Sequence, residues 1–391
     1  MDRGKNGMLT HLVIVSLESW DEIWRRNQYL VDGLLRAHPS LEVLFVEPPA
    51  DPVHAALHRR RPTLGKGLRV ASGYGGRLHL LQPTKLLPRA LGPAADALLR
   101  ERILRAIRSL GWKDGILWIN DPGAAQLTLR LRWPSVYDIT DDWVEAARGQ
   151  REHDRIQRAD ALLLGTCDEV VVCSPGLVRS KRTLRTAGAS VLRLVPNAVD
   201  RERYRVPLPR PGDAPPTPFA LYVGTLHEDR LDVGLVTATA RAVAKVAGEV
   251  VLLGPNALSD ENRRRLEAEP ALRVLGARPW DEVPAYLQHA DVLIVPHVVD
   301  DFTESLDPIK LYEYLAVGRP IVSTPVAGFR DDPRVNVASA SDFPATVVEQ
   351  VTARETTVEH DGVPDWGDRV VALTEVLEAL TARSAQRPLR Y

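Results

Sequence analysis

The stretch DDFTESLDPIKLYEYLAVGRPIVSTPVAGFR, residues 300–330, predicts a loop, a short helix, a tight turn and a buried strand in that order. Asp307 is a favourable N-cap residue, and Pro308 suits the first helical position because its missing N–H would have no partner there. Gly318 suits the position just past the helix end. We therefore expect a helix between them whose side chains are mostly apolar and mostly buried.

The remaining face of this helix carries two opposite charges. Lys310 and Glu313 stand three positions apart, so they lie on one side of the helix. Free N–H groups at a helix start and a lysine in the first turn suit phosphate, and a carboxylate one turn further on suits two ribose hydroxyls. The pattern therefore indicates a nucleotide site. The alternative is an ion pair on a solvated helix face.

The pattern P-x-K-L-Y-E-Y-L-A-x-G-x-P, residues 308–320, resembles the donor-nucleotide segment of GT-B glycosyltransferases of family 4, the group 1 kind. Many of these enzymes have two glutamates eight positions apart, the first near the sugar and phosphates and the second on the ribose. Glu313 matches the second glutamate. The first falls on Ser305, and the nearest glutamate, Glu304, comes one residue early.

Composition bounds the remaining possibilities. At 391 residues the chain exceeds what one hydrophobic core usually serves, so we expect two domains. A net charge of −1 gives no reason to expect nucleic acid as a partner. Cys167 and Cys173 are too few for a disulfide framework. Because no signal peptide and no run of about 18 apolar residues is present, we expect a cytoplasmic protein without a membrane span.

The N-terminal part begins with a predicted βαβ unit: a strand at 11–17, a helix at 21–38 and a strand at 41–47. Its first turn, SLESWDE, contains no glycine, which argues against a dinucleotide-binding dehydrogenase and departs from the glycine pair of many GT-B relatives. One interpretation of this turn and helix start is a solvated arginine face with aromatic packing. The other is that the helix start lines a ligand cleft. The candidate cleft or acceptor residues are Trp20, Arg25, Arg26 and Asn120.

Residues 48–92 are basic and rich in turns, so we expect a mobile connection over the mouth of the first domain. Within it, the segment HRRRPTLGKGLR, residues 58–69, is a candidate for weak peripheral contact with a membrane. A helix at 93–110 and a strand at 115–120 are expected to follow.

Three carboxylates lie in SVYDITDDW, residues 135–143, where a predicted strand ends. They are Asp138, Asp141 and Asp142. Open α/β sheets bind ligands beyond the carboxyl ends of their strands. In the resembled family a histidine near the donor sugar often follows such a strand, and by order Asp141 or Asp142 takes its place. The aspartates lack the spacing of an Asp-x-Asp metal site, so we expect no metal.

Residues 205–218 hold six prolines and read as a stiff linker. We therefore expect a first domain at 1–200, joined by a C-terminal helix at about 366–391, and a donor domain at 201–365.

The second domain opens with FALYVGTL, a strand that runs into Gly224, and Arg230 follows. In the resembled family a basic residue after this glycine neutralises the donor diphosphate. Arg230 matches that residue loosely, and Lys310 is the candidate for a second positive charge.

The resemblance implies the GT-B fold, an α/β architecture of two Rossmann-like doubly wound domains that face each other across a cleft. It implies transfer of a sugar from a nucleotide diphosphate sugar to an acceptor hydroxyl, with retention and without a metal or cofactor. The alternatives are a GT-B-type sugar-nucleotide epimerase or sugar phosphorylase, and a non-catalytic sugar-nucleotide binding protein. The catalytic candidates are Arg230, Lys310, Asp141 and Asp142. The donor-binding candidates are Gly224, Glu304, Ser305, Asp307, Pro308, Ile309 and Glu313.

Overall fold

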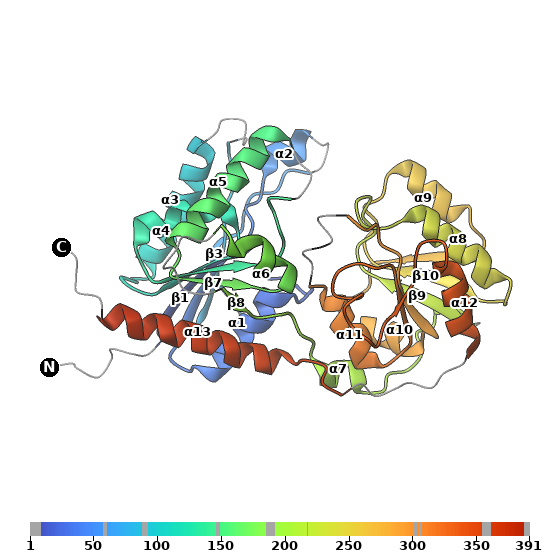
Figure 1. The fold of residues 1–391 in the computed structure, drawn as a ribbon. Coiled ribbons are helices and arrows are strands. Elements are labelled where there is room, and N and C mark those ends of the chain that lie inside the picture. The colour runs from blue at the N-terminus through green and yellow to red at the C-terminus, as the bar shows by residue number, and fades with distance from the viewer. Residues whose placement is uncertain are drawn as a thin grey trace. The chain divides into compact units, whose positions relative to one another are not determined.

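The computed structural model describes residues 9–57, 61–87, 93–145, 149–184, 192–216, 218–300, 304, 307–353 and 361–386. The chain divides into two compact units (Figure 1). Unit 1 comprises residues 1–196 and 366–391, and unit 2 comprises residues 197–365. Each unit contains its own sheet and its own buried apolar clusters.

The sheet of unit 1 is parallel except at one edge. Its described strands follow the order β3-β4-β2-β1-β5-β6-β7-β8, in which β3 runs antiparallel to β4. The strand order changes direction between β1 and β5, and doubly wound sheets bind ligands at the carboxyl ends of such a pair. The strands are β1 (His11–Val15), β2 (Glu42–Val46), β3 (Gly67–Val70), β4 (Leu78–Gln82), β5 (Ile116–Ile119), β6 (Ser135–Ile139), β7 (Glu169–Val172) and β8 (Arg193–Leu194).

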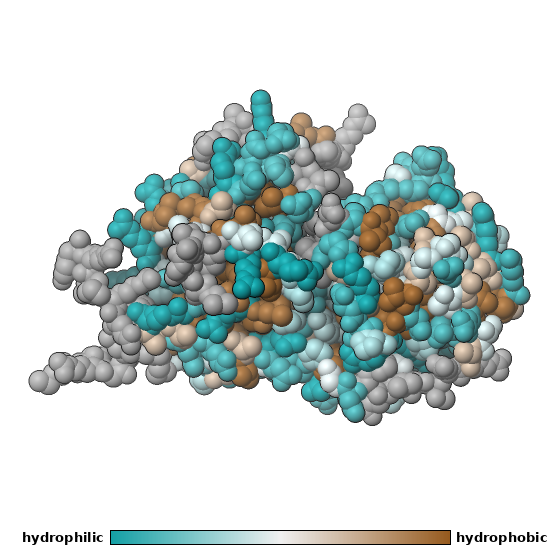
Figure 2. All heavy atoms as spheres, viewed as in Figure 1, coloured by the Kyte–Doolittle hydropathy of each residue, from teal (hydrophilic) through white to brown (hydrophobic). Residues whose placement is uncertain are grey.

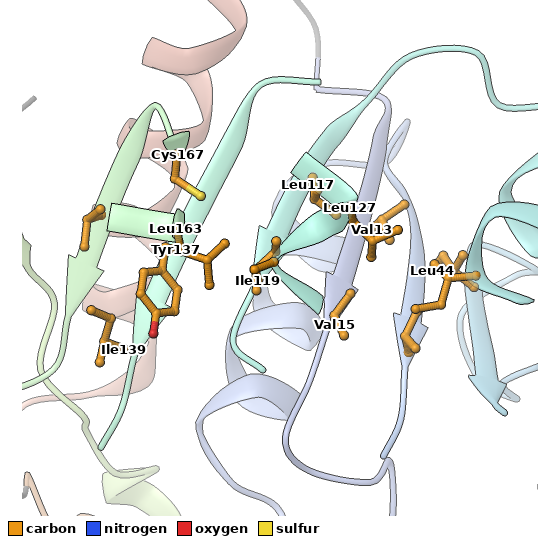
Figure 3. Packing of buried hydrophobic residues seen from close by; sticks show 14 of the residues in the cluster. Val13, Val15, Leu44, Leu117, Ile119, Leu127, Tyr137, Ile139, Leu163 and Cys167 are labelled. Carbon is orange, nitrogen blue, oxygen red and sulfur yellow. The ribbon is translucent and has the colours of Figure 1, made fainter. Parts of the chain in front are cut away.

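Helices bury the apolar side chains of this sheet. Alternate strand residues such as Val13, Val15 and Leu117 pack with Leu127 and Leu163 from two of these helices (Figure 3). Such alternation follows from the two-residue repeat of a strand. The C-terminal helix lies beside the first helix of the same unit (Figure 1). The helices are α1 (Arg26–Ala37), α2 (Pro52–Leu57), α3 (Pro93–Ser109), the 3-10 turn η2 (Pro122–Ala124), α4 (Gln126–Leu131), α5 (Gln150–Thr166), α6 (Pro175–Arg182) and α13 (Trp366–Gln386).

Unit 2 is a second doubly wound sheet, parallel throughout its described strands. The order β11-β10-β9-β12-β13-β14 changes direction between β9 and β12. Two apolar clusters share the strand residues, with Leu221 in one and its neighbour Tyr222 in the other. The strands are β9 (Phe219–Val223), β10 (Glu249–Leu253), β11 (Leu272–Gly276), β12 (Val292–Val295), β13 (Ile321–Ser323) and β14 (Asn336–Val337). The helices are α7 (Arg201–Arg205), α8 (Val233–Ala244), α9 (Asp260–Glu267), α10 (Val283–His289), α11 (Ile309–Val317) and α12 (Phe343–Ala353).

The prediction of a mobile connection at 48–92 is wrong for the described part of that segment. It contains α2, β3 and β4, and β4 pairs in parallel with β2. Leu78, Leu80 and Leu81 are buried. The run LHLLQ is short and glycines precede it, so it becomes recognisable as a strand only through a partner far along the chain.

The helix predicted from residue 21 begins later than expected. α1 starts at Arg26, because turns occupy the residues before it. The Asp21 carboxylate accepts the N–H of Ile23, and the side-chain oxygen of Gln28 accepts the N–H of Arg25. The Asp21 bond belongs to a local turn that competes with the helix, whereas the Gln28 bond is part of a capping box that starts the helix after Arg25.

Hydrophilic side chains cover most of the face seen in Figure 2, and hydrophobic ones form separate groups. No helix within the described ranges is both long enough and apolar enough to cross a membrane. In the segment predicted to contact a membrane, residues 58–60 lie outside the described part, whereas Leu64 and Leu68 are exposed. That contact stays a prediction.

Candidate functional site

Three segments of unit 2 meet where the strand order of its sheet changes direction. Gly224 follows β9, His297 follows β12, and α11 begins after the loop that leaves β12. Gly224 has a φ of 145°, and a Cβ at Gly254 would lie 2.2 Å from the Gly224 carbonyl oxygen. Glycine alone allows both this φ and this close approach. The two glycines thus leave the ends of β9 and β10 free of side chains.

The start of α11 differs from the sequence prediction. Its N-cap residue is Pro308, and the helix begins at Ile309. Asp307, predicted as the N-cap, instead accepts hydrogen bonds from the backbone N–H of Asn197 and from the hydroxyl of Tyr312. Because Pro308 has no N–H, the first backbone donor of the helix start is that of Ile309. Asp307 fixes the helix start rather than capping it.

The side chain of Lys310 reaches the turn after β9. Its Nζ atom lies 4.0 Å from the ring centroid of Tyr222, a cation–π geometry. A Cβ at Gly224 would lie 2.7 Å from the same Nζ atom. Within the described part of the chain, Lys310 has no ion pair and no hydrogen bond through Nζ. The N–H donors of Lys310 are therefore available to a ligand.

Three basic side chains gather at this point. Burial lowers the pKa of Lys310 to about 7; the nearby Arg230 acts in the same direction and Glu313 opposes it. Burial also holds the pKa of His297 well below its ordinary value, and Lys310 and Arg230 add to this effect. His297 Nε2 lies 3.0 Å from the Tyr222 hydroxyl oxygen. Basic side chains held this close suit a ligand that brings negative charge, because such a ligand favours their charged forms.

Among the described residues, hydrogen bonds reach only one oxygen of Glu313. The Tyr204 hydroxyl donates a hydrogen bond of 2.6 Å to Oε1, and no other described residue bonds the carboxylate. Burial raises the pKa of Glu313, whereas the Tyr204 hydrogen bond and the charges of Lys310 and Arg203 lower it. A carboxylate with one free oxygen beside a lysine suits vicinal hydroxyls next to a phosphate.

Glu304 already has a partner. Both of its oxygens contact the Arg330 guanidinium at 2.5 Å, which ties the loop before α11 to the segment after β13. Ser305, predicted in the place of the first family glutamate, lies outside the described residues.

The structure brings together some predicted donor residues and adds others. Those that converge at the switch point of unit 2 are Gly224, Arg230, Lys310 and Glu313. Sequence reasoning missed Tyr204, Tyr222 and His297. Tyr222 and His297 each stand at the end of an apolar run, FALY and VLIVPH, and this position was a usable signal. The two runs form β9 and β12, which are neighbours in the sheet. For Tyr204, in the short helix α7 just before the proline-rich segment, no such signal existed.

The predicted cleft residues of unit 1 belong largely to a buried polar network. Arg26 Nε and Nη2 each lie 3.1 Å from the Asp138 carboxylate, and both side chains are buried. The Asn120 side chain accepts from Asn27 at 3.0 Å and donates to the Asp138 carbonyl at 2.9 Å. The interpretation of a solvated arginine face is therefore wrong for Arg26. These bonds hold α1 to the ends of β5 and β6.

Trp20 and Arg25 lie in the turn between β1 and α1. The Trp20 ring packs edge-on against Phe45 and Tyr74 at centroid distances of 5.1 and 5.9 Å. Arg25 is partly exposed and forms an ion pair with Asp21. Contact of either residue with an acceptor stays a prediction.

Asp141 and Asp142 have different surroundings. Asp142 is buried, and its carboxylate accepts hydrogen bonds from Lys181 Nζ at 2.7 Å and from the Ser180 hydroxyl at 3.1 Å. The same lysine bonds Asp160 at 3.2 Å. Asp141 is partly exposed. Asp142 therefore anchors the loop after β6, and across the described ranges no group of His, Cys, Asp and Glu side chains could hold a metal ion.

Sequence reasoning also missed Glu18, which follows β1 at the switch point of unit 1. Its Oε2 atom is shielded from solvent and has no hydrogen-bond partner in the described part of the chain. Burial raises the pKa of Glu18 to about 7; Asp141 also raises it, and Arg25 lowers it. Nothing in the turn SLESWDE distinguishes Glu18 from the exposed Glu22.

The two doubly wound units define the fold of GT-B glycosyltransferases. Sucrose-phosphate synthase from Thermosynechococcus elongatus matches with a TM-score of 0.63 at 18% identity, over 96% of this chain and 98% of that one. The α,α-trehalose-phosphate synthase (UDP-forming) from Burkholderia vietnamiensis matches with 0.63 at 13% identity, over 97% and 96%. Anabaena HepE, solved with UDP and glucose, matches with 0.60 at 12% identity, over 96% and 98%. The predicted fold class is confirmed.

Unit 2 also matches a family in sequence. Residues 217–353 match the model described as glycosyl transferases group 1. The putative teichuronic acid biosynthesis glycosyltransferase TuaH of Bacillus subtilis (strain 168) is 26% identical over 220 residues, which cover 53% of this chain and 55% of TuaH. The match spans about half the length of that relative. The predicted resemblance to group 1 glycosyltransferases is confirmed, and the matching segment holds Lys310 and Glu313.

Proposed function

We propose that this protein transfers a glycosyl group from a nucleoside diphosphate sugar to an acceptor hydroxyl. The observation that carries the proposal is the placement of Lys310 and Glu313 on one face of α11, beside Gly224. This pair lies within the segment that matches group 1 glycosyltransferases. One member offers N–H donors that no described residue uses, and the other offers a carboxylate oxygen that no described residue bonds; phosphate and ribose require such groups.

In this proposal the donor diphosphate contacts Lys310, Arg230 and the backbone N–H of Ile309. The ribose hydroxyls contact the free oxygen of Glu313. As the bond between the sugar and the diphosphate breaks, negative charge grows on the leaving phosphate, and cations already in place lower the barrier. The lowered pKa of Lys310 supports an anion-binding role, because burial and the nearby Arg230 disfavour its ammonium form, whereas a bound phosphate would favour it.

We extend the proposal to retention of configuration without a metal. Asp142 is occupied by Lys181 and Ser180, which makes it a poor nucleophile. A phosphate oxygen of the donor then accepts the proton of the attacking hydroxyl, as the family resemblance implies. The anomeric configuration of the product, read by NMR, tests retention directly.

The first test is a thermal-shift panel of UDP, ADP, GDP, CDP and dTDP. A nucleotide at about 100 times its dissociation constant adds roughly 2.7 kcal/mol to stability. The nucleotide sugar of the best binder is then incubated with and without acceptor-containing extract. Release of the nucleoside diphosphate only with acceptor supports a transferase. Conversion of the donor without acceptor indicates an epimerase, and an intact donor under every condition indicates a binding protein.

A further inference from the structure

Lys310, Arg230 and His297 form a basic cluster in unit 2, and the protonation state of Lys310 depends on its surroundings there. Lys310 on α11 faces Glu313 on the same helix, Tyr222 on β9, Arg230 after β9 and His297 after β12. Glu313 is the one carboxylate among them, and its Oε1 is already bonded to Tyr204. The cluster therefore contains more basic groups than acidic ones.

Geometry sets two opposing influences on the charge of Lys310. The Tyr222 ring and Glu313 favour the ammonium form, whereas burial and the Arg230 guanidinium favour the neutral amine. The second pair prevails, since the pKa lies at about 7. Without a ligand, Lys310 therefore loses its proton as the pH rises through about 7, whereas an exposed lysine stays charged at these pH values.

We propose that Lys310 takes up one proton from solvent when a nucleotide sugar binds, so that donor binding is coupled to pH through this side chain. The inference rests on the proposed function. In the coupled step the neutral amine gains a third N–H bond, and the diphosphate supplies the negative charge that stabilises it. Donor affinity then falls with rising pH, because more of the free protein must be protonated during binding.

Tyr222 and His297 act as positioning residues in this device. The 3.0 Å contact between the Tyr222 hydroxyl and His297 Nε2 fixes the ring under Lys310. The backbone N–H of His297 donates to the Thr324 hydroxyl at 3.2 Å, which holds His297 in turn. His297 itself stays neutral near pH 7 because burial keeps its pKa well below the ordinary value. This separates its role from that of Lys310.

The test is isothermal titration calorimetry with UDP-glucose, ADP-glucose and GDP-mannose, whose phosphates do not titrate near neutral pH. Each titration is run from about pH 6 to about pH 8.5 in two buffers of different ionisation enthalpy. The difference in heat between the buffers gives the number of protons taken up. We expect a value near zero at about pH 6 that approaches one at about pH 8.5, with affinity falling up to about tenfold per pH unit above 7.

Matched variants identify the group that takes the proton. The ratio of wild-type to Lys310→Gln affinity should shrink as pH rises, and Lys310→Gln should show no proton uptake at about pH 8.5. The exposed Lys245→Gln should keep the wild-type uptake. A ratio that stays constant with pH, or proton uptake that persists in Lys310→Gln, overturns the inference.

Failure of the inference differs from failure of the proposed function. Binding of a nucleotide sugar without proton uptake overturns the coupling and leaves the donor site standing. No binding of any of the three nucleotide sugars removes the donor site for these donors and the coupling with it.

Discussion

The Tyr204 hydroxyl donates a hydrogen bond of 2.6 Å to Glu313 Oε1, so that α7 fixes a carboxylate presented by α11. Tyr204 is 1% exposed, and its ring packs in the same apolar cluster as Leu311 and Leu315 of α11. The carboxylate is therefore oriented before a ligand arrives, and little side-chain entropy remains to be lost on binding.

This relationship predicts the effect of removing the carboxylate. Glu313→Ala should weaken nucleoside diphosphate binding by about 1.5–3 kcal/mol, because a charge-assisted hydrogen bond to ribose is lost. Tyr204→Phe should cost less, since the carboxylate remains but is less fixed. Calorimetry checks both, with the exposed Glu349→Ala as control. Unchanged affinity in Glu313→Ala would limit Glu313 to a structural role.

How much of this site the sequence predicts depends on how far apart along the chain the interacting residues stand. Lys310 and Glu313 were found because helical spacing is local, and Gly224 because it ends an apolar strand. Tyr222 and His297 required knowledge that β9 and β12 are neighbours. The edge strand β3, its neighbour β4 and the burial of Arg26 against Asp138 depend on contacts with distant segments, which no local pattern records.

Arg230 should matter more to turnover than to donor binding. The extra negative charge on the diphosphate appears only as the sugar bond breaks, so a cation placed there mainly stabilises the transition state. Arg230→Ala should lower kcat by about a hundredfold or more, with a smaller change in donor affinity. Steady-state kinetics alongside calorimetry measures both quantities. Arg263→Ala, on the exposed face of α9, is the control. A near-normal kcat in Arg230→Ala would move the search to Arg25.

Activity should survive chelation. Asp142 already has Lys181 and Ser180 as partners, and Asp138, Asp141 and Asp142 lack the Asp-x-Asp spacing of a metal site. Transfer rates are measured before and after treatment with excess EDTA. A loss of transfer that magnesium or manganese restores would contradict this expectation and the proposed stabilisation by side-chain cations.

Breaking the buried pair of Arg26 and Asp138 should destabilise unit 1 strongly. Asp138→Ala leaves the Arg26 guanidinium buried with a missing partner, and such losses cost about 3–5 kcal/mol. Urea unfolding of Asp138→Ala measures the loss. The double variant Arg26→Met with Asp138→Leu should recover much of the stability, because it removes both charges. Equal destabilisation by the single and the double variant would show that the charge itself is not the cause.

Glu18 should make stability fall as pH rises through neutrality. Its pKa is raised from 4.5 to about 7 in the folded protein, chiefly by burial. Between these values the folded state binds more protons than the unfolded state, so stability is fully present below about pH 4.5 and is lost as pH rises through 7. Each unit of difference between the pKa in the folded and in the unfolded protein corresponds to about 1.4 kcal/mol of stability.

Glu18→Gln removes this ionisation, and its amide oxygen can still accept the backbone N–H of Asn27. Near about pH 5 the variant and the wild type should have similar urea midpoints, whereas near about pH 8 the variant should be the more stable. The exposed neighbour Glu22→Gln should follow the wild type at both pH values. A Glu18→Gln profile parallel to the wild type would mean that Glu18 ionises as freely in the folded protein as in the unfolded chain. Its shielded Oε2 would then have to reach water.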